Sequence, residues 1–248
     1  MFQFFVEESA VGGDAIYIED NDVNHIKNAL RMKPGEKIRV CTRGGDGACY
    51  MCEISEITDD MVTASILYKE ENTSELPARI HLFQGLPKGD KMELVIQKSV
   101  ELGAFEIIPV AMKNCVVKLD DKKAAKKVQR WQAVSESAAK QSKRMMIPQI
   151  SDVMSFKEAF EYASKMDVIL LPYENAAGMA PTKAAFESVR PGTDVAVFIG
   201  PEGGFDPSEI SLAEGKSEII SLGSRILRTE TAGLAVLSML MYVLETGK

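Results

Sequence analysis

The fold of this chain is decided at VAVFIGPEGGFDPSE, residues 195–209, where an apolar run enters a glycine-rich turn and then a helix start. The run 195–200 is apolar apart from its closing glycine and predicts a buried strand. Asp206 is a good N-cap, Pro207 suits the first helical position and Glu209 completes a capping-box pattern. A strand, a loop and a helix in this order are typical of an α/β sheet, in which ligands lie beyond the carboxyl ends of the strands.

The glycine-rich turn, residues 201–205, indicates the kind of ligand that it suits. Such turns often bind phosphate, but this one has neither a GxGxxG pattern nor the Lys-Ser/Thr pair of a P-loop. The carboxylate of Glu202 would also repel a phosphate. An acidic turn better suits a ligand that offers hydroxyls or positive charge, such as a ribose joined to a sulfonium. The alternative is a tight strand-to-helix turn with Glu202 in solvent.

A second turn of this kind, LGSRILRTETAG at 222–233, follows the apolar run 218–222. Arg225 and Arg228 precede a predicted helix N-terminus, where the helix dipole disfavours cations. We therefore expect these arginines to serve another purpose, such as contact with a phosphate or a reacting base. The alternative is structural, with Thr229 as an N-cap and the apolar pair between the arginines in the core.

Strand-like and helix-like patterns alternate along the second part of the chain. Strands are predicted at 79–84, 106–110, 168–171, 195–199 and 218–222. Helices are predicted at 91–102, 122–140, 156–165, 207–215 and 231–246. This alternation predicts an α/β domain with a mostly parallel sheet. The strand at 168–171 also runs into a turn, LPYE, which is a weak signal by itself.

The part of the chain before the polar stretch 69–79 follows a different pattern. Short alternating runs separated by turn signals predict a small β-rich module over residues 1–70. Within this module we expect a hairpin turn at 44–47 and one helix at 22–32. The α/β domain is predicted over residues 75–248.

The charge of the chain is distributed unevenly. The chain has 248 residues, a net charge of −7 and an ordinary globular composition, which excludes disordered, collagenous and disulfide-framework classes. The net charge by itself argues against a nucleic-acid partner. However, residues 1–70 carry seven Lys and Arg against thirteen Asp and Glu, whereas residues 118–144 carry nine against three. This distribution allows RNA binding, although a solvated helix face is the alternative for the basic stretch.

The cysteines and histidines give little sign of a metal site. Four cysteines in a chain of this length indicate a reducing compartment. Cys49-x-x-Cys52 has no second cysteine pair, and the chain has two histidines, so we predict no metal. The N-terminus has no secretory pattern and the apolar run 232–244 is too short to span a bilayer. We therefore expect a cytoplasmic protein with no membrane segment.

Taken together, these motifs resemble one family. FIGPEGGF at 198–205 and LGSRILRTETAG at 222–233 are similar to the signature of the ribosomal RNA small subunit methyltransferase E family, of the SPOUT class. Supporting matches are NHIKNALRMKPGEKI at 24–38, KGDKMELVIQKSVELG at 88–103, RWQAVSESAAKQSKR at 130–144 and LPYE at 171–174. The resemblance implies a PUA-like β-barrel before a SPOUT domain with a C-terminal trefoil knot. It also implies a homodimer that uses S-adenosylmethionine to methylate uridine N3 in 16S rRNA, within the small ribosomal subunit.

The resemblance also implies which residues form the site. The catalytic candidates are Arg228, on the substrate side, and Glu230 beside it. The residues implied to bind the cofactor are Leu171, Pro172, Glu174, Gly200, Pro201, Glu202, Gly203, Leu222, Gly223, Ile226, Leu227, Thr231 and Ala232. The residues expected to contact RNA, chosen for their charge, are Arg31, Lys33, Lys118, Lys126, Lys127, Arg130, Lys143 and Arg144.

Two positions depart from the family pattern. Gln3 stands where an arginine is common, and Lys113-Asn114 stand where an acid and an arginine are common. Both departures bear on RNA docking rather than on the cofactor. Two other functions remain open: methylation of another RNA atom, such as a ribose 2′-hydroxyl, and RNA binding without catalysis.

Overall fold

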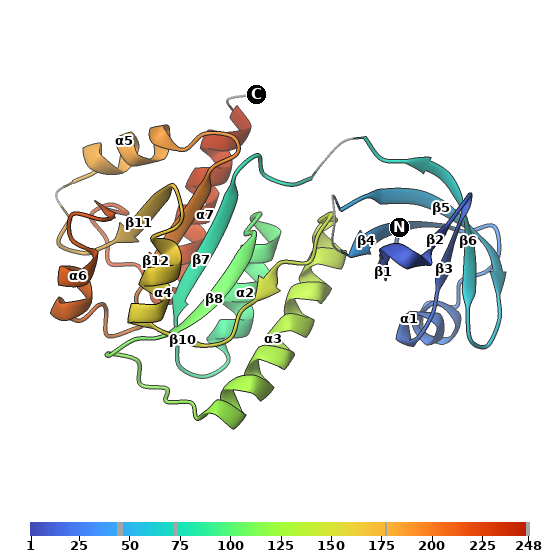
Figure 1. The fold of residues 1–248 in the computed structure, drawn as a ribbon, viewed down its shortest axis with the longest axis horizontal. Coiled ribbons are helices and arrows are strands. Elements are labelled where there is room, and N and C mark those ends of the chain that lie inside the picture. The colour runs from blue at the N-terminus through green and yellow to red at the C-terminus, as the bar shows by residue number, and fades with distance from the viewer. Residues whose placement is uncertain (44–46, 72–73, 177, 247–248) are drawn as a thin grey trace. The chain divides into compact units, whose positions relative to one another are not determined.

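The structure of the chain, a computed structural model, describes residues 1–43, 47–71, 74–176 and 178–246. It divides into two units (Figure 1). The first unit comprises Met1–Glu75 and Ala139–Ile147, and the second comprises Leu76–Ala138 and Pro148–Lys248. The first unit therefore includes a short segment that lies far along the chain, which the sequence pattern does not reveal.

The first unit is built on a curled six-stranded sheet (Figure 1). Its strands, in the order β1-β4-β5-β6-β3-β2, are β1 (Gln3–Glu7), β2 (Val11–Gly12), β3 (Ala15–Ile18), β4 (Lys37–Arg43), β5 (Cys49–Ile57) and β6 (Val62–Lys69). In β3 the buried Ile16 and Ile18 flank the exposed Tyr17, which is the alternation of a strand with one face on a core. A short 3-10 turn, η1 (Glu8–Ala10), links the first two strands.

The helix predicted at 22–32 is shorter than expected. It consists of α1 (Asn21–Asn24) and one turn of π-helix, η2 (His25–Ala29). Val23 and Ile26 are buried in the core of the first unit, as their helical spacing predicts. The helical turns end before Arg31, which has a φ of 54°. A residue in this left-handed conformation cannot continue a right-handed helix.

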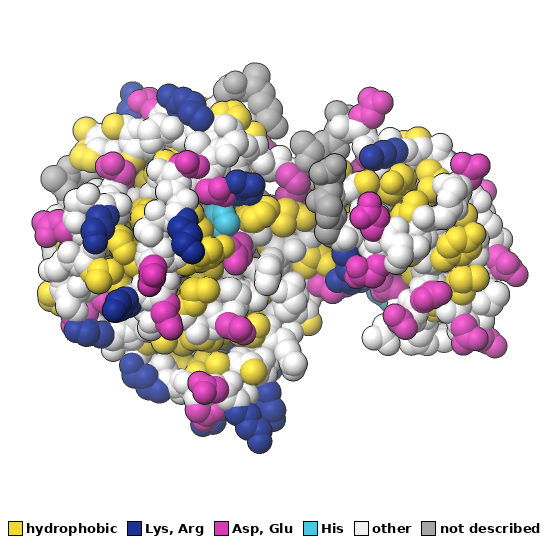
Figure 2. Space-filling view, viewed as in Figure 1, with side chains coloured by type: hydrophobic (Ala, Val, Ile, Leu, Met, Phe, Trp, Pro, Cys, Tyr) yellow, Lys and Arg dark blue, Asp and Glu magenta, His cyan; other side chains and the backbone are white. Residues whose placement is uncertain are grey.

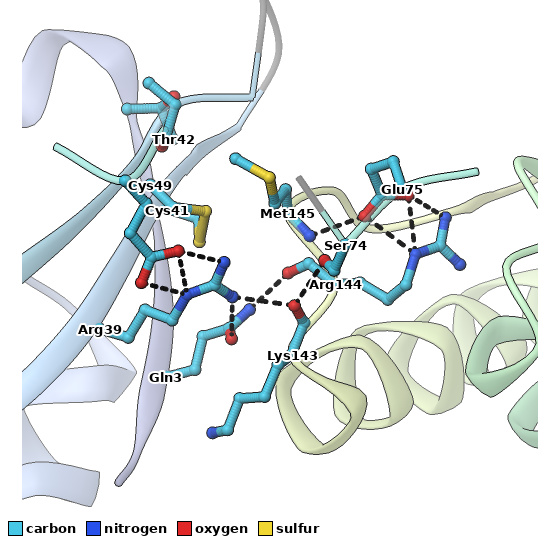
Figure 3. Close-up of a disulfide and its surroundings, with 12 residues drawn as sticks. Gln3, Arg39, Cys41, Thr42, Cys49, Ser74, Glu75, Lys143, Arg144 and Met145 are labelled. Atoms are coloured by element: carbon cyan, nitrogen blue, oxygen red, sulfur yellow. Dashed lines mark hydrogen bonds and ion pairs between the residues drawn. A yellow bond between two sulfur atoms is a disulfide. The ribbon is translucent and has the colours of Figure 1, made fainter. Parts of the chain in front are cut away.

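The hairpin turn predicted at 44–47 falls between β4 and β5 in the chain. These two strands pair antiparallel, with Cys41 opposite Cys49, while Gly44, Gly45 and Asp46 lie outside the described residues. Cys41 and Cys49 form a disulfide (Figure 3). The sequence did not predict this pairing, because it indicated a reducing compartment, in which thiols stay reduced.

The second unit has a seven-stranded sheet, and all of its strand pairs are parallel. The order is β10-β8-β7-β12-β11-β13, with β9 also paired to β8. The strands are β7 (Arg79–Gly85), β8 (Glu106–Ala111), β9 (Gln149–Ile150), β10 (Met154–Ser155), β11 (Val168–Pro172), β12 (Asp194–Ile199) and β13 (Glu218–Ile220). The mostly parallel sheet predicted from the sequence is confirmed.

Six helices accompany this sheet in the described part of the chain. They are α2 (Lys91–Glu101), α3 (Asp121–Ser142), α4 (Phe156–Ala163), α5 (Ala180–Ser188), α6 (Pro207–Ala213) and α7 (Thr229–Thr246). Five of them were predicted. The sequence missed α5, because Gly178 and Pro181 interrupt its pattern and resemble turn signals.

Helices pack on both faces of the parallel sheet (Figure 1). On one face Phe83 and Phe198 stack with their ring centroids 4.4 Å apart, and Phe156 of α4 packs on Phe198. On the other face Gly233 of α7 lies close to Leu82, the strand neighbour of Phe83. This double burial explains why the strands are continuous apolar runs in the sequence. The knot implied by the resemblance stays a prediction.

None of the helices in the described part of the chain combines the length and the apolar character that a membrane span requires.

Candidate functional site

The turns predicted to bind a ligand follow neighbouring strands of the second sheet. β11 pairs in parallel with both β12 and β13, and β12 pairs in parallel with β7. The carboxyl ends of parallel strands meet at one edge of a sheet, so the turns after β11, β12 and β13 come together there. The segment after β7, which contains Lys88 and leads into α2, joins them.

The glycine-rich turn after β12 approaches its neighbours closely. A Cβ on Gly85, the last residue of β7, would lie 2.7 Å from the nitrogen of Pro201 and 3.0 Å from the carbonyl oxygen of Ile199. Only glycine therefore fits at this position. On another side, the Asn114 amide donates hydrogen bonds to the carbonyls of Gly203, at 3.1 Å, and Gly204, at 3.3 Å. The turn is thus held by both neighbouring segments.

Glu202 is held by Lys91 at the start of α2 and by Lys88 just before it, instead of lying free in solvent. Its Oε1 accepts a hydrogen bond from the backbone N–H of Lys88 at 3.1 Å and lies 3.3 Å from Nζ of Lys91. Its side chain is 22% exposed. Desolvation acts to raise the pKa of Glu202, but hydrogen bonds from backbone N–H groups and Lys91 outweigh it and lower the pKa below its usual value. The residue is therefore a fixed carboxylate at neutral pH.

Lys91 is a site residue that the sequence did not single out. Besides Glu202 it contacts Glu230, with 3.2 Å between Nζ and Oε2. The hydrogen bond to Glu230 raises the pKa of Lys91; desolvation opposes the rise and the bond to Glu202 adds to it. A signal was present, since Lys91 is the first residue of α2, where the helix dipole disfavours a cation.

The helix start predicted after the glycine-rich turn is confirmed. Asp206 caps α6, and Asp206 and Glu209 form the full capping box. Lys113 reinforces this cap, because its Nζ lies 3.0 Å from Asp206 and its backbone N–H donates to Glu209 at 2.9 Å. Hydrogen bonds from the hydroxyl and backbone N–H of Ser208, followed by the bond from Lys113, lower the pKa of Asp206 to about 2. Lys113 and Asn114, expected to bear on RNA docking, thus contact the glycine-rich turn and its helix.

The start of α7 is tied to the same edge of the sheet by Thr229. Its hydroxyl donates to the carbonyl of Gly200 at 2.7 Å and accepts from the buried amide of Gln84 at 2.9 Å. Thr229 is therefore structural, but as the first residue of α7 bonded to Gly200 and not as the N-cap considered from the sequence. The neighbouring Arg228 is exposed, and among the described residues its side chain makes no hydrogen bond or ion pair. Its guanidinium is free to meet a substrate.

The turn after β13 is fixed by α5, the helix that the sequence missed. The hydroxyl of Thr182 donates to the carbonyl of Ser221 and accepts from its backbone N–H, both at 2.9 Å. Gly223 has a φ of 103°, which only glycine adopts readily. Ile226 is 86% exposed, so it is not part of the core.

The remaining residues expected to bind the cofactor differ in exposure. Leu171 is buried, Pro172, Leu222, Leu227 and Ala232 are half-buried, and Glu174 and Thr231 are exposed. The structure brings the turns together at one edge. Among the described residues, no three or more His, Cys, Asp or Glu side chains are grouped to hold a metal ion.

The residues expected to contact RNA divide into two groups. Arg31, Lys33, Lys118, Lys126 and Arg130 are exposed and Lys127 is half-buried. Figure 2 shows Lys and Arg side chains at the lower end of α3, whereas Asp and Glu dominate the visible face of the first unit. Arg130 pairs with Glu93 at 2.7 Å. The exposed group remains suited to phosphate.

Lys143 and Arg144 form the second group, and both are engaged inside the first unit (Figure 3). Arg144 is 3% exposed, and its guanidinium pairs with Glu75. Nζ of Lys143 donates to the carbonyl of Met1 at 2.7 Å, and burial lowers its pKa. The structure thus corrects the expectation for Arg144, because a buried and paired guanidinium cannot reach a phosphate.

Gln3, the other departure from the family pattern, is also structural. It is buried, accepts a hydrogen bond from Arg39 at 2.6 Å and donates one to the carbonyl of Arg144 at 2.7 Å (Figure 3). Arg39 in turn donates to the carbonyl of Lys143 at 2.9 Å. These contacts hold the segment 139–147 within the first unit.

Comparison with known proteins covers nearly the whole chain. The family described as RNA methyltransferase domain matches residues 74–241, and the one described as RNA methyltransferase PUA domain matches residues 18–67. The chain is 38% identical to the ribosomal RNA small subunit methyltransferase E of Bacillus subtilis, covering 92% of this chain and 90% of that protein. It is 33% identical to the protein of that name from Mesomycoplasma hyopneumoniae, covering 96% and 98%. The Neisseria gonorrhoeae protein of that name, crystallised with bound S-adenosyl methionine, has a TM-score of 0.80 at 34% identity and covers 96% of each chain.

Proposed function

Because the chain belongs to the ribosomal RNA small subunit methyltransferase E family, with its SPOUT-type fold and PUA domain, we propose that it methylates N3 of one uridine in 16S rRNA, using S-adenosylmethionine. The observation that carries this proposal is the meeting of the turns after β11, β12 and β13 at one sheet edge, beside the exposed Arg228.

The residues at this edge fit the cofactor. Glu202 is a carboxylate held by a backbone N–H and a lysine, and such a group suits ribose hydroxyls or a sulfonium. The glycine-rich turn is fixed by Asn114 and by close packing on Gly85, so the chain can present a preformed surface to the cofactor. When bound, S-adenosylmethionine supplies the methyl group.

Arg228 is the residue proposed to contact the substrate base. Uridine N3 is a weak acid and must lose its proton, at least in part, to accept a methyl group. A guanidinium near the uracil carbonyl oxygens stabilises the developing negative charge. Holding the base and the donor in line would lower the entropic cost of the reaction, and turns fixed as these are would be suited to that task. Glu230, which contacts Lys91, lies two residues from Arg228 and completes the proposed catalytic pair.

The RNA itself is proposed to bind along the exposed basic residues of the second unit. Lys118, Lys126, Lys127 and Arg130 would contact phosphates, and Arg31 and Lys33 of the first unit would assist. We further propose that the protein acts as a cytoplasmic homodimer on rRNA of the small ribosomal subunit. Sedimentation of the purified protein measures the dimer directly.

The decisive experiment identifies the methylated nucleoside. Small subunits from a strain without this gene are incubated with the protein and S-adenosylmethionine, and their nucleosides are analysed by mass spectrometry. We expect 3-methyluridine to appear. A 2′-O-methylated nucleoside would replace the proposal by methylation of another RNA atom. RNA binding with neither methylation nor heat of cofactor binding would leave a non-catalytic RNA-binding protein.

A further inference from the structure

Lys91 links three segments that lie far apart in the sequence. It is the first residue of α2, Glu202 lies in the turn after β12, and Glu230 lies in the first turn of α7. The ammonium of Lys91 lies 3.3 Å from Glu202 and 3.2 Å from Glu230. One lysine therefore bridges two carboxylates that belong to two different site segments.

The position of Lys91 is not explained by the stability of its own helix. A cation in the first turn opposes the helix dipole. Lys98, near the end of the same helix, shows the ordinary arrangement, since it pairs with its helical neighbour Glu101 at 2.8 Å, where the dipole favours a cation. Lys91 instead reaches away from α2 to two carboxylates whose side chains are 22% and 19% exposed.

The two carboxylates also need a cation between them. Two negative groups that share one small region repel each other, and the repulsion grows as water is excluded. Glu202 has a backbone N–H partner besides Lys91, at Lys88, whereas the Glu230 side chain is held by its contact with Lys91. Without Lys91, the start of α7 would keep its Thr229–Gly200 hydrogen bond, but the Glu230 side chain would lose its link to Glu202.

We propose that Lys91 is a positioning residue, which joins the glycine-rich turn at Glu202 to the start of α7 at Glu230. It thereby keeps the turn that is proposed to bind the cofactor aligned with Arg228, which is proposed to contact the substrate. This inference rests on the proposed function. Lys91 acts through the two glutamates, and an arginine in its place would serve in part, because a guanidinium also binds two carboxylates.

The test compares three variants of the full-length protein. Lys91→Gln removes the bridging charge, Lys91→Arg retains it, and Lys98→Gln removes an ion pair of the same helix away from the site. Affinity for S-adenosylmethionine is measured by calorimetry, kcat and KM are measured with small subunits, and thermal unfolding is followed in parallel. The wild-type protein in the same series tests the proposed function.

For Lys91→Gln we expect kcat/KM to fall about 10-fold or more, with a lower kcat at saturating cofactor, because alignment of the two sides is lost. Lys91→Arg should recover a large part of this loss. Lys98→Gln should keep wild-type kinetics. The unfolding midpoints should differ little among the three variants, because partly exposed ion pairs contribute little stability.

A Lys91→Gln enzyme with kcat and KM within about twofold of wild type would overturn the inference while leaving the proposed function intact. The same holds if Lys91→Arg is folded but no better than Lys91→Gln, or if Lys98→Gln is equally impaired. If Lys91→Gln does not fold, Lys91→Met, which keeps the apolar stem without the charge, takes its place, and kcat and KM within about twofold of wild type for that variant would overturn the inference. Absence of methylation by the wild-type protein would instead contradict the proposed function.

Discussion

At the residue scale, the contrast between Arg228 and the charged residues around it defines the site. Lys91 forms ion pairs with both Glu202 and Glu230. Arg228, in contrast, is exposed and unpaired within the described structure. A charged side chain that has no structural partner is the one that a substrate can engage. Arg225 on the same segment is exposed as well, but Arg228 directly precedes Thr229, which is bonded to Gly200, so Arg228 is the better candidate for contact with the reacting base.

We expect Arg228→Ala to reduce methyl transfer by about 100-fold or more, because the developing charge on the uracil loses its stabilising partner. Affinity for S-adenosylmethionine should stay within about threefold of wild type. Single-turnover methylation and calorimetry measure the two quantities separately. Lys216→Ala, which removes an exposed cation just before β13, at the opposite edge of the sheet, is the control and should keep the wild-type rate. An unchanged single-turnover rate would remove Arg228 from the catalytic residues.

The cap of α6 gives a pH-dependent prediction. The pKa of Asp206 is about 2 in the folded protein, below the ordinary value of 3.8. The folded protein therefore binds fewer protons, so the contribution of Asp206 to stability is present above about pH 4 and is lost as the pH falls towards about 2. Asp206→Asn keeps a good capping residue and should lose less stability over this window.

Unfolding midpoints measured at intervals from about pH 5 down to about pH 2 follow this effect. Asp152→Asn, which removes another exposed carboxylate, is the control and should follow the wild-type profile. Parallel acid profiles of wild type and Asp206→Asn would show that the cap is not set by the charge of Asp206.

At the element scale, the hairpin of β4 and β5 carries the disulfide between Cys41 and Cys49. Register alone decides this pairing, since the two cysteines are directly opposed across the strands. Cys52 and Cys115 are free and buried. Burial raises the pKa of Cys52 to about 11 and also raises that of Cys115, so neither is a reactive thiol at neutral pH.

We expect two thiols to titrate in the denatured oxidised protein and four after reduction. In the native oxidised protein none should react quickly. Reduction should lower stability by about 2 kcal/mol, because the disulfide closes a short loop. The double variant Cys41→Ala, Cys49→Ala should be insensitive to reductant. Four thiols in the air-oxidised denatured protein would show that the two cysteines do not pair in solution.

The elements also explain which site residues were predictable. The turns after β12 and β13 were predicted, because strand, turn and cap signals lie within a few residues of one another. Lys91 and Thr182 were missed as site residues, and Asn114 was assigned to RNA docking instead of the glycine-rich turn, because each meets its partner only after strands distant in the sequence pair. No local pattern records such a contact.

At the scale of the whole molecule, the distribution of charge matters more than its sum. The net charge is −7, yet α3 presents exposed lysines at its start. Attraction to RNA at physiological salt acts over about 8 Å. A local basic surface can therefore bind phosphate although the protein as a whole is acidic.

We expect Lys126→Glu, Lys127→Glu to weaken RNA binding about 10-fold or more and to reduce the slope of log affinity against log salt by about 1.5, since two phosphate contacts are lost. The control is Lys157→Glu, Lys165→Glu, which changes the net charge equally at exposed positions elsewhere. Binding titrations over a range of salt concentrations measure both slopes. Equal slopes for the two variants would identify the α3 lysines as a solvated face.

The sequence by itself determined the parallel α/β sheet, the capped helix after the glycine-rich turn and the family, because each depends on residues that are close along the chain. The tertiary structure decided which charges are free and which are held. Arg144 lies in a basic stretch typical of an RNA contact and is buried against Glu75, whereas Lys91 shows in sequence only an unfavourable place at a helix start and bridges two glutamates of the site. The physical reason is that the partner of a charged side chain depends on distance in space. These distances are fixed only when the strands have paired and the sheet has formed.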